Sequence, residues 1–189
     1  MNRTLLGTAL ALLAIAAMRA PASGMSAQSA KPETFTAKAT PGNVTENADS
    51  ITLTFVINRY ATEPEHTTLR DTLKQGPAAL RAALKAMPEL GSIAVGKQRT
   101  ALKYAYRRPN TQAITLLTDE PIAYLDPGGA KDKPKEGYDL ALVILDFSTP
   151  GFAVGELDPA VKVMINSSGM IVTQDYGAAV VRLTSVKKQ

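Results

Sequence analysis

Cysteine and tryptophan are both absent from this chain of 189 residues. Without thiols the protein cannot form disulfides, zinc ribbons, iron–sulfur clusters or a cysteine nucleophile. A bacterial lipoprotein anchor, which is attached to a cysteine, is excluded for the same reason. A folded domain must therefore be held together by packing and backbone hydrogen bonds alone.

Histidine occurs once, as His66, and aromatic residues make up only 5% of the chain. One imidazole cannot supply the several histidines typical of catalytic zinc sites, and no G-x-S-x-G sequence is present to pair it with a serine nucleophile. We expect His66 to be a polar residue in the exposed first turn of a helix; a metal ligand or general base is the alternative. The few aromatic residues argue against stacking platforms for sugars or single-stranded nucleic acid.

Glycine-rich phosphate loops are also missing, because the glycines fall in turn sequences. We therefore expect no nucleotide and no other cofactor. The formal net charge is +4, but two of the basic residues, Arg3 and Arg19, lie in or beside an N-terminal apolar segment. Without them 19 basic residues face 17 acidic ones. So small an excess does not predict a nucleic acid or an anionic membrane as partner.

The N-terminus has the three parts of a secretory signal peptide. Arg3 gives a positive start, an apolar run extends from Leu5 to Met18, and small residues follow. The run is shorter than the roughly 20 residues that cross a bilayer as a helix. We therefore expect cleavage, and a retained membrane anchor is the alternative.

The chain is expected to divide into a leader and one domain. Residues 1–24 form the signal peptide, with the cleavage site between 22 and 29; residues 25–32 form a flexible N-terminus, and 33–189 a single β-rich domain. We expect the mature protein to be secreted or periplasmic, with no membrane span after cleavage.

Helical periodicity is confined to one segment, where leucines recur at helical spacing. Thr62 and Glu65 have the spacing of a capping box, which marks the start of a helix. Gly76-Pro77 separates two helices, because glycine ends a helix and proline begins one. We predict short helices over about 63–75 and 77–87.

Elsewhere apolar and polar residues alternate, as in strands with one buried face. The segment from Tyr138 to Phe147 is apolar on both faces, which is typical of a central strand. The expected fold is α+β: a mainly antiparallel β-sheet, sandwich or barrel-like, with a pair of short helices inserted after the second strand. After a strand over Ile51–Ile57 and the helices, strands are expected at about 92–97, 100–107, 111–118, 138–147, 151–157, 160–166, 170–175 and 179–186.

Four stretches give the chain a resemblance to other proteins. They are Thr118–Ile122, Tyr138–Phe147, Gly155–Leu157 and Val181–Leu183. From the helices to the C-terminus, the chain resembles a family of uncharacterised secreted bacterial proteins of unknown function. The resemblance implies export and a bacterial source, and it implies no activity and no site residue.

A basic face is the clearest candidate binding site. The expected strand KQRTALKYAYRR places Lys97, Arg99, Lys103 and Arg107 on one side, because side chains alternate along a strand. This face would bind an acidic ligand, such as an acidic glycan, a phosphate-bearing lipid or an acidic protein. The alternative is a solvated outer face, or edge lysines that prevent aggregation.

Carboxylates at turns and strand ends offer a second kind of site, since a pair of them can hydrolyse a glycosidic bond. Neighbours on a strand point to opposite faces, so Asp119 and Glu120 do not naturally form such a pair. The other candidates are Asp126, Asp139, Asp146, Glu156 and Asp158. We assign no catalytic residue and no metal ligand.

The leading interpretation is an exported, non-catalytic β-rich domain that binds or interacts in the cell envelope or outside the cell, with an acidic ligand or an envelope component as partner. One alternative is a secreted hydrolase with a loop-borne carboxylate site. Another is a barrel-type carrier of a small apolar ligand. A cavity inside the barrel would favour the carrier, clustered acids in a cleft the hydrolase, and a filled core the interaction domain.

Overall fold

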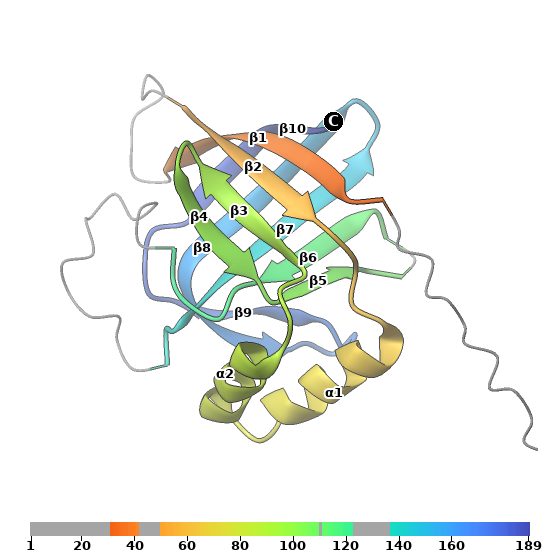
Figure 1. Cartoon of the computed structure of the whole chain (residues 1–189), viewed down its shortest axis with the longest axis vertical. Helices are drawn as coiled ribbons and strands as arrows, with labels where there is room; N and C mark the ends of the chain where they lie inside the picture. The colour runs from red at the N-terminus through yellow and green to blue at the C-terminus, as the bar shows by residue number, and fades with distance from the viewer. Residues whose placement is uncertain (1–30, 42–49, 110, 123–136) are drawn as a thin grey trace, which may run out of the picture.

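The computed structural model describes residues 31–41, 50–109, 111–122 and 137–189. The expected signal peptide and the candidate carboxylate Asp126 lie outside these residues. In the described part, one sheet has the strand order β4-β3-β2-β1-β10-β8-β7-β6-β5, and β9 pairs with β8. Every pairing is antiparallel, and the sheet curls into a nearly closed barrel with two helices at one end (Figure 1).

These elements confirm the expected α+β, barrel-like fold with a helical pair after the second strand. The helices are α1 (Glu63–Leu73) and α2 (Pro77–Ala86). The strands are β1 (Glu33–Pro41), β2 (Ile51–Ile57), β3 (Gly91–Val95), β4 (Gln98–Leu102), β5 (Tyr104–Arg107), β6 (Ala113–Leu117), β7 (Leu140–Thr149), β8 (Phe152–Ile165), β9 (Ile171–Tyr176) and β10 (Val181–Lys188). No helix in the described residues is long and apolar enough to cross a membrane.

The inward-facing side chains of the strands form the barrel core. Leu53, Phe55 and Ile57 alternate along β2 and are almost fully buried, and Phe35 and Ala39 of β1 meet them inside the sheet. Fully burying one such large side chain contributes about 1.5–3 kcal/mol. The barrel interior is thus filled by the alternating apolar side chains that the sequence predicts.

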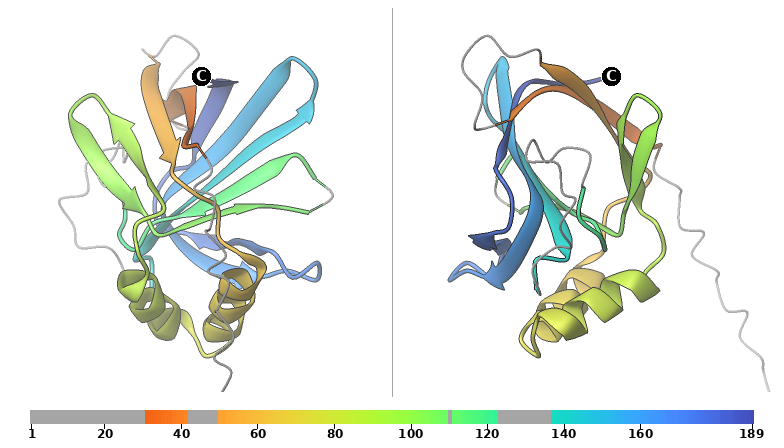
Figure 2. Two further views of the ribbon diagram at one scale, coloured as in Figure 1. Left: turned by 45° about the vertical axis from the view of Figure 1, so that its right-hand side comes forward. Right: turned by 90° about the vertical axis from the view of Figure 1, so that its left-hand side faces the viewer.

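A second core lies between the helices and the outer face of the sheet. Leu69 of α1 and Leu80 and Leu84 of α2 pack with Leu142 of β7 and Val161 of β8. Figure 2 shows both helices at one end of the barrel and the C-terminus at the other. Because β7 contributes to both cores, the prediction of a central strand that is apolar on both faces is confirmed.

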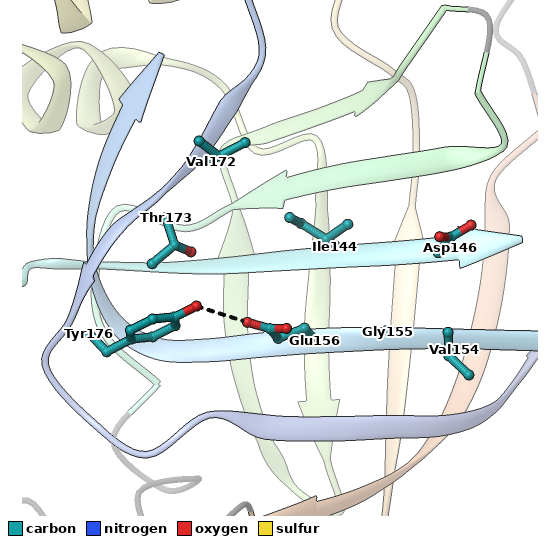
Figure 3. Close-up of a pocket in the computed structure, with 8 residues that line it drawn as sticks. All are labelled: Ile144, Asp146, Val154, Gly155, Glu156, Val172, Thr173 and Tyr176. Atoms are coloured by element: carbon teal, nitrogen blue, oxygen red, sulfur yellow. Dashed lines mark hydrogen bonds between the residues drawn. The ribbon is translucent and has the colours of Figure 1, made fainter. Parts of the chain in front are cut away.

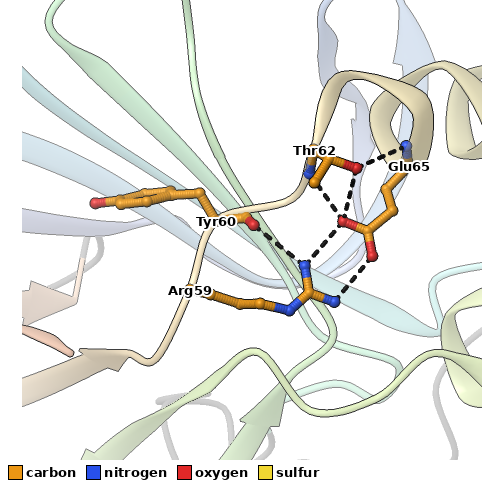
Figure 4. Close-up of polar contacts among 4 residues, drawn as sticks. All are labelled: Arg59, Tyr60, Thr62 and Glu65. Atoms are coloured by element: carbon orange, nitrogen blue, oxygen red, sulfur yellow. Dashed lines mark hydrogen bonds and ion pairs between the residues drawn. The ribbon is translucent and has the colours of Figure 1, made fainter. Parts of the chain in front are cut away.

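The start of α1 is fixed by the predicted capping box. The Thr62 hydroxyl accepts from the Glu65 backbone N–H at 3.4 Å, and the Glu65 carboxylate accepts from the Thr62 backbone N–H at 2.8 Å. Arg59 donates both guanidinium nitrogens to the same carboxylate, at 2.9 and 2.8 Å, and also donates to the Tyr60 carbonyl (Figure 4). The Arg59 hydrogen bonds, opposed in part by burial, lower the pKa of Glu65 to about 2.

The prediction of a single strand over 100–107 is wrong, because the strand is interrupted at Lys103. β4 pairs with β3, whereas β5 pairs with β6, and these strands stand at opposite ends of the sheet order. The Lys103 backbone N–H bonds to the Leu117 carbonyl at 2.9 Å. Leu102 lies in the barrel core, but Tyr104 faces the helices, so the alternation shifts at this residue.

The two strands expected over 151–157 and 160–166 are one continuous strand, β8. Its first half pairs with β10 and its second half with β9. The register shifts opposite β7 between Asp158 and Val161, and Pro159 lies in this irregular stretch. Proline is tolerated at such a bulge because no regular ladder hydrogen bond is needed there.

Candidate functional site

A groove of about 440 Å³ lies on the outer face of the barrel over β7 and β8, beside β9. In Figure 3 the β9 side chains stand at one end of the row, and Asp146 and Val154 at the other. The groove is lined by Ile144, Asp146, Val154, Gly155, Glu156, Val172, Thr173 and Tyr176.

The strand registers explain which side chains reach the groove. Ile144 pairs with Glu156, and Asp146 with Val154, so these four positions alternate with the inward-facing ones. Between them Gly155 faces inward, where a Cβ would lie 2.7 Å from the Ile144 carbonyl oxygen and 3.2 Å from Leu183. The absence of a side chain at Gly155 therefore allows Leu183 and the Ile144 backbone to pack closely beneath the groove.

Two apolar side chains of the groove are open to solvent. Val154 is 43% exposed and Tyr176 is 49% exposed. The Tyr176 hydroxyl lies 3.3 Å from the Glu156 carboxylate, to which it donates a hydrogen bond (Figure 3). The groove therefore combines apolar surface with a carboxylate that accepts a long hydrogen bond from Tyr176.

Asp158 lies on β8 next to the groove and is only 3% exposed. Thr173, which lines the groove, donates its hydroxyl to Asp158 Oδ2, while Oδ1 is buried and accepts no hydrogen bond from the described residues. Burial raises the pKa of Asp158 to about 6, and the Glu156 carboxylate adds to the rise, although the Thr173 hydrogen bond opposes it. A protonated Oδ1 can donate to Glu156, which satisfies the buried oxygen.

Asp146 has a different environment at the other end of the groove. Its Oδ1 accepts from the Ser148 backbone N–H at 2.8 Å. Hydrogen bonds from Ser148 lower the pKa of Asp146, and the charge of Arg108 contributes to the same effect. Asp146 is therefore ionised at neutral pH, so this end of the groove carries negative charge.

His66 forms a second polar cluster, beneath α1. It is only 3% exposed, so the expectation of an exposed first-turn residue is wrong. Its ring stacks on Tyr106 with 4.0 Å between centroids, and a 2.5 Å hydrogen bond joins Nδ1 to the Tyr104 hydroxyl. The physical reason is helix geometry: with Leu69 and Leu73, it occupies the face of α1 that packs on the sheet.

The environment of His66 favours the neutral imidazole. Burial lowers its pKa; the charge of Glu63 opposes this effect and that of Arg70 adds to it. Nε2 is buried without a hydrogen-bond partner. In the part of the chain that the structure describes, no group of three or more potential ligands is arranged to hold a metal ion. His66 is thus part of the packing between helix and sheet.

The four basic residues of the expected binding face lie in different settings. Lys97 is in the turn between β3 and β4. Arg99 forms an ion pair with Glu89, and Lys103 donates to the Met87 carbonyl at 3.1 Å. The fourth, Arg107, is separated from the others by the break between β4 and β5 and pairs with a different acid.

That acid is Glu33, which links strands from distant parts of the sequence. Arg107 of β5 and Lys188 of β10 form ion pairs with its carboxylate at 2.8 and 2.6 Å, and the Tyr60 hydroxyl donates to it at 2.5 Å. The Arg107 guanidinium carbon lies 4.8 Å from the centre of the Tyr60 ring. An acidic ligand at the basic residues stays a prediction; it would have to compete with Glu33 for Arg107.

The other predicted carboxylates are spread over the surface. Asp139 forms an ion pair with Arg81 at 3.3 Å, and Asp119 and Glu120 lie in the bend after β6. Of the predicted acids, the structure brings Asp146, Glu156 and Asp158 to one region. Sequence reasoning missed Thr173 and Tyr176, because no motif connects β9 with the outer face of β7 and β8.

No family model, curated protein or solved structure matches this chain. The fold and the groove together define the class: a barrel-like α+β domain with a filled interior and an open groove on its outer face. The functional argument therefore depends on this geometry alone.

Proposed function

We propose that the protein is an exported, non-catalytic β-rich domain that binds a partner in the cell envelope or outside the cell, and that the groove over β7, β8 and β9 is its binding surface. The observation that carries the proposal is the exposed apolar surface of Val154 and Tyr176 in a groove that also holds carboxylates. Exposed apolar patches with polar neighbours mark interaction sites on soluble domains. The signal-peptide pattern of the N-terminus supports export.

The filled barrel favours this proposal over a carrier of an apolar ligand. Side chains from both halves of the sheet, such as Phe55 of β2 and Val143 of β7, pack together inside it with at most 1% exposure. A hollow of about 530 Å³ lies beside Phe147 and Val186. Phe147 packs there against Phe35, with 5.4 Å between ring centroids, which favours a closed interior.

The hydrolase alternative depends on the pair of Glu156 and Asp158. Two neighbouring carboxyl groups, one of them with a raised pKa, resemble the pairs that acid–base catalysis uses. However, a catalytic acid must reach the substrate, and Asp158 is almost completely buried beside Thr173. The pair therefore favours a charged binding surface over a catalytic centre.

Photo-crosslinking in the native host tests the proposal. We expect benzoylphenylalanine in place of Tyr176 to form discrete crosslinks to an envelope or extracellular component. The same group in place of Ile51, an apolar residue that is 36% exposed on β2, is the matched control and should form none of them. Mass spectrometry of the crosslinked protein should also find a mature N-terminus between residues 23 and 30.

Two results would contradict the proposal. Crosslinks that are identical from positions 176 and 51 would show no preference for the groove. A full-length chain in the cytosol, with its leader intact, would contradict export.

A further inference from the structure

The groove is rich in carboxyl groups, and this indicates which chemical class of partner it can bind. We propose that the groove binds an extended protein segment that carries lysine or arginine next to apolar side chains. This inference rests on the proposed function, since it names the partner chemistry of the same groove.

The apolar part of the partner has a defined place to contact. Val154 and the Tyr176 ring are exposed in the groove. These two are among the few large hydrophobic residues that stand exposed in the described part of the chain. Covering such apolar surface would favour binding.

The charges of the groove are complementary to a cation. Asp146 and Glu156 are lining residues, and Asp158 lies beside them. Two guanidinium groups lie near these acids. The Cα of Arg182 pairs with that of Glu156 across β8 and β10, and no ion pair joins the two side chains in the described structure. Arg108 donates to the Thr115 hydroxyl, and its charge acts on Asp146. Three carboxyl groups thus stand against two guanidinium groups around this groove, although the whole chain is net positive.

Asp158 strengthens the case for a cation because its Oδ1 has no donor while the carboxyl is ionised. Burial and the charge of Glu156 raise the pKa of Asp158. The groups that face it are Glu156 on its own strand and Thr173 and Tyr176 of β9. A cation bound at Glu156 would favour loss of the Asp158 proton, so affinity should rise as the pH increases through about 6.

An extended peptide fits better than a small free cation because of the position of β9. In the described sheet β9 pairs with β8 alone, so it is an edge strand of that sheet. Peptides commonly add as strands to such an edge, where main-chain hydrogen bonds give affinity and alternate side chains give specificity. β9 also supplies Val172, Thr173 and Tyr176 to the groove, so one strand contributes both a sheet edge and side chains that line the groove.

Fluorescence anisotropy of the mature domain tests the inference. The probe is a fluorescein-labelled heptapeptide of alternating leucine and lysine, and its control is the same peptide with glutamate in place of lysine. We expect the lysine peptide to bind and the glutamate peptide not to bind. Spermidine, a free polycation, should compete only at concentrations at least tenfold above the dissociation constant of the lysine peptide.

Matched variants locate the binding. Glu156→Gln should weaken binding of the lysine peptide about tenfold, as expected for loss of a charged partner. Tyr176→Ser should weaken it through loss of apolar contact. Asp71→Asn, which removes an exposed carboxylate on α1, should leave the affinity unchanged. Circular dichroism of each variant checks that the fold is retained.

Equal binding of both peptides, equal effects of Glu156→Gln and Asp71→Asn, or competition by spermidine at the affinity of the peptide would each overturn the inference. The crosslinks from position 176 separate this failure from failure of the proposed function. If they form on a segment without lysine or arginine, the groove binds a partner of another chemistry. If they do not form at all, the proposed function itself is wrong.

Discussion

At the scale of single residues, two buried polar side chains both favour their neutral forms, but their contributions to stability change with pH in opposite directions. His66 is buried between α1 and β5, and its lowered pKa favours the neutral form, so protonation opposes folding. This contribution to stability is present above the ordinary histidine pKa of about 6.5 and is lost as the pH falls through the lowered value. Asp158 also favours its neutral form, but for an acid this means that ionisation opposes folding.

The pKa of Asp158 is raised from 3.8 to about 6, so the folded state binds its proton more tightly than the unfolded state. Its contribution to stability is therefore present below about pH 4 and is lost as the pH rises through 6. Asp158→Asn keeps the shape and removes the charge. We expect the variant to increase the free energy of unfolding by about 2 kcal/mol at pH 8 and by much less at pH 4.

Urea unfolding of both proteins at the two pH values measures this difference. The wild-type protein should lose stability relative to the variant between pH 4 and 7. A variant that is less stable than the wild type at pH 8 would show that the ionised carboxylate is well accommodated, contrary to the account.

At the scale of secondary-structure elements, α1 depends on a carboxylate at its N-terminus. The lowered pKa of Glu65 means that its ionised form favours folding; this contribution is present above pH 4.5 and is lost as the pH falls towards 2. Glu65→Gln keeps a capping acceptor but loses the charge that binds Arg59. The free energy of unfolding should fall by about 1 kcal/mol at pH 7, and the difference should vanish near pH 2.

Chemical denaturation at pH 7 and at pH 2.5 checks this effect. The matched control is Asp71→Asn, because Asp71 also forms an ion pair with a basic residue but is fully solvated. The control should be indistinguishable from the wild type. An equal decrease in the free energy of unfolding of both variants would mean that the Arg59–Glu65 ion pair contributes no more to stability than an exposed ion pair does.

Elements whose signals are local were predictable from the sequence, and those that depend on distant partners were not. The capping box at Thr62 and the break at Gly76 located both helices within two residues, because caps act over three or four residues. The break at Lys103 was missed, since it arises where the chain changes from β3 to β6 as partner. The continuity of β8 was missed because Asp158-Pro159 resembles a turn, yet it forms a bulge inside a strand.

The site was less predictable than the fold for the same reason. Asp146, Glu156 and Asp158 were recognised as candidate carboxylates, but nothing local indicates that β9 brings Thr173 and Tyr176 beside them. The burial of His66 follows from its helical spacing with Leu69, so this signal was present in the sequence. The groove forms because the second half of β8 pairs with β9, which places β9 side chains beside those of β7 and β8.

At the scale of the whole molecule, a filled barrel supports a groove on its outside. Residues from β1, β5 and β10 meet at the Glu33 carboxylate, which links the two ends of the described chain to β5, the last strand of the sheet order. Without disulfides, this cluster and the two hydrophobic cores hold the strands in register. A rigid support of this kind keeps the side chains of the groove in place for recognition.

The measurement that tests the central claim most directly is amide chemical-shift mapping of the ¹⁵N-labelled mature domain with the partner identified by crosslinking. The account predicts that the perturbed amides cluster at residues 144–146, 154–158 and 172–176. Perturbations centred on Arg99 and Lys103, or on the hollow beside Phe147 and Val186, would contradict it and would place the binding surface elsewhere on the barrel.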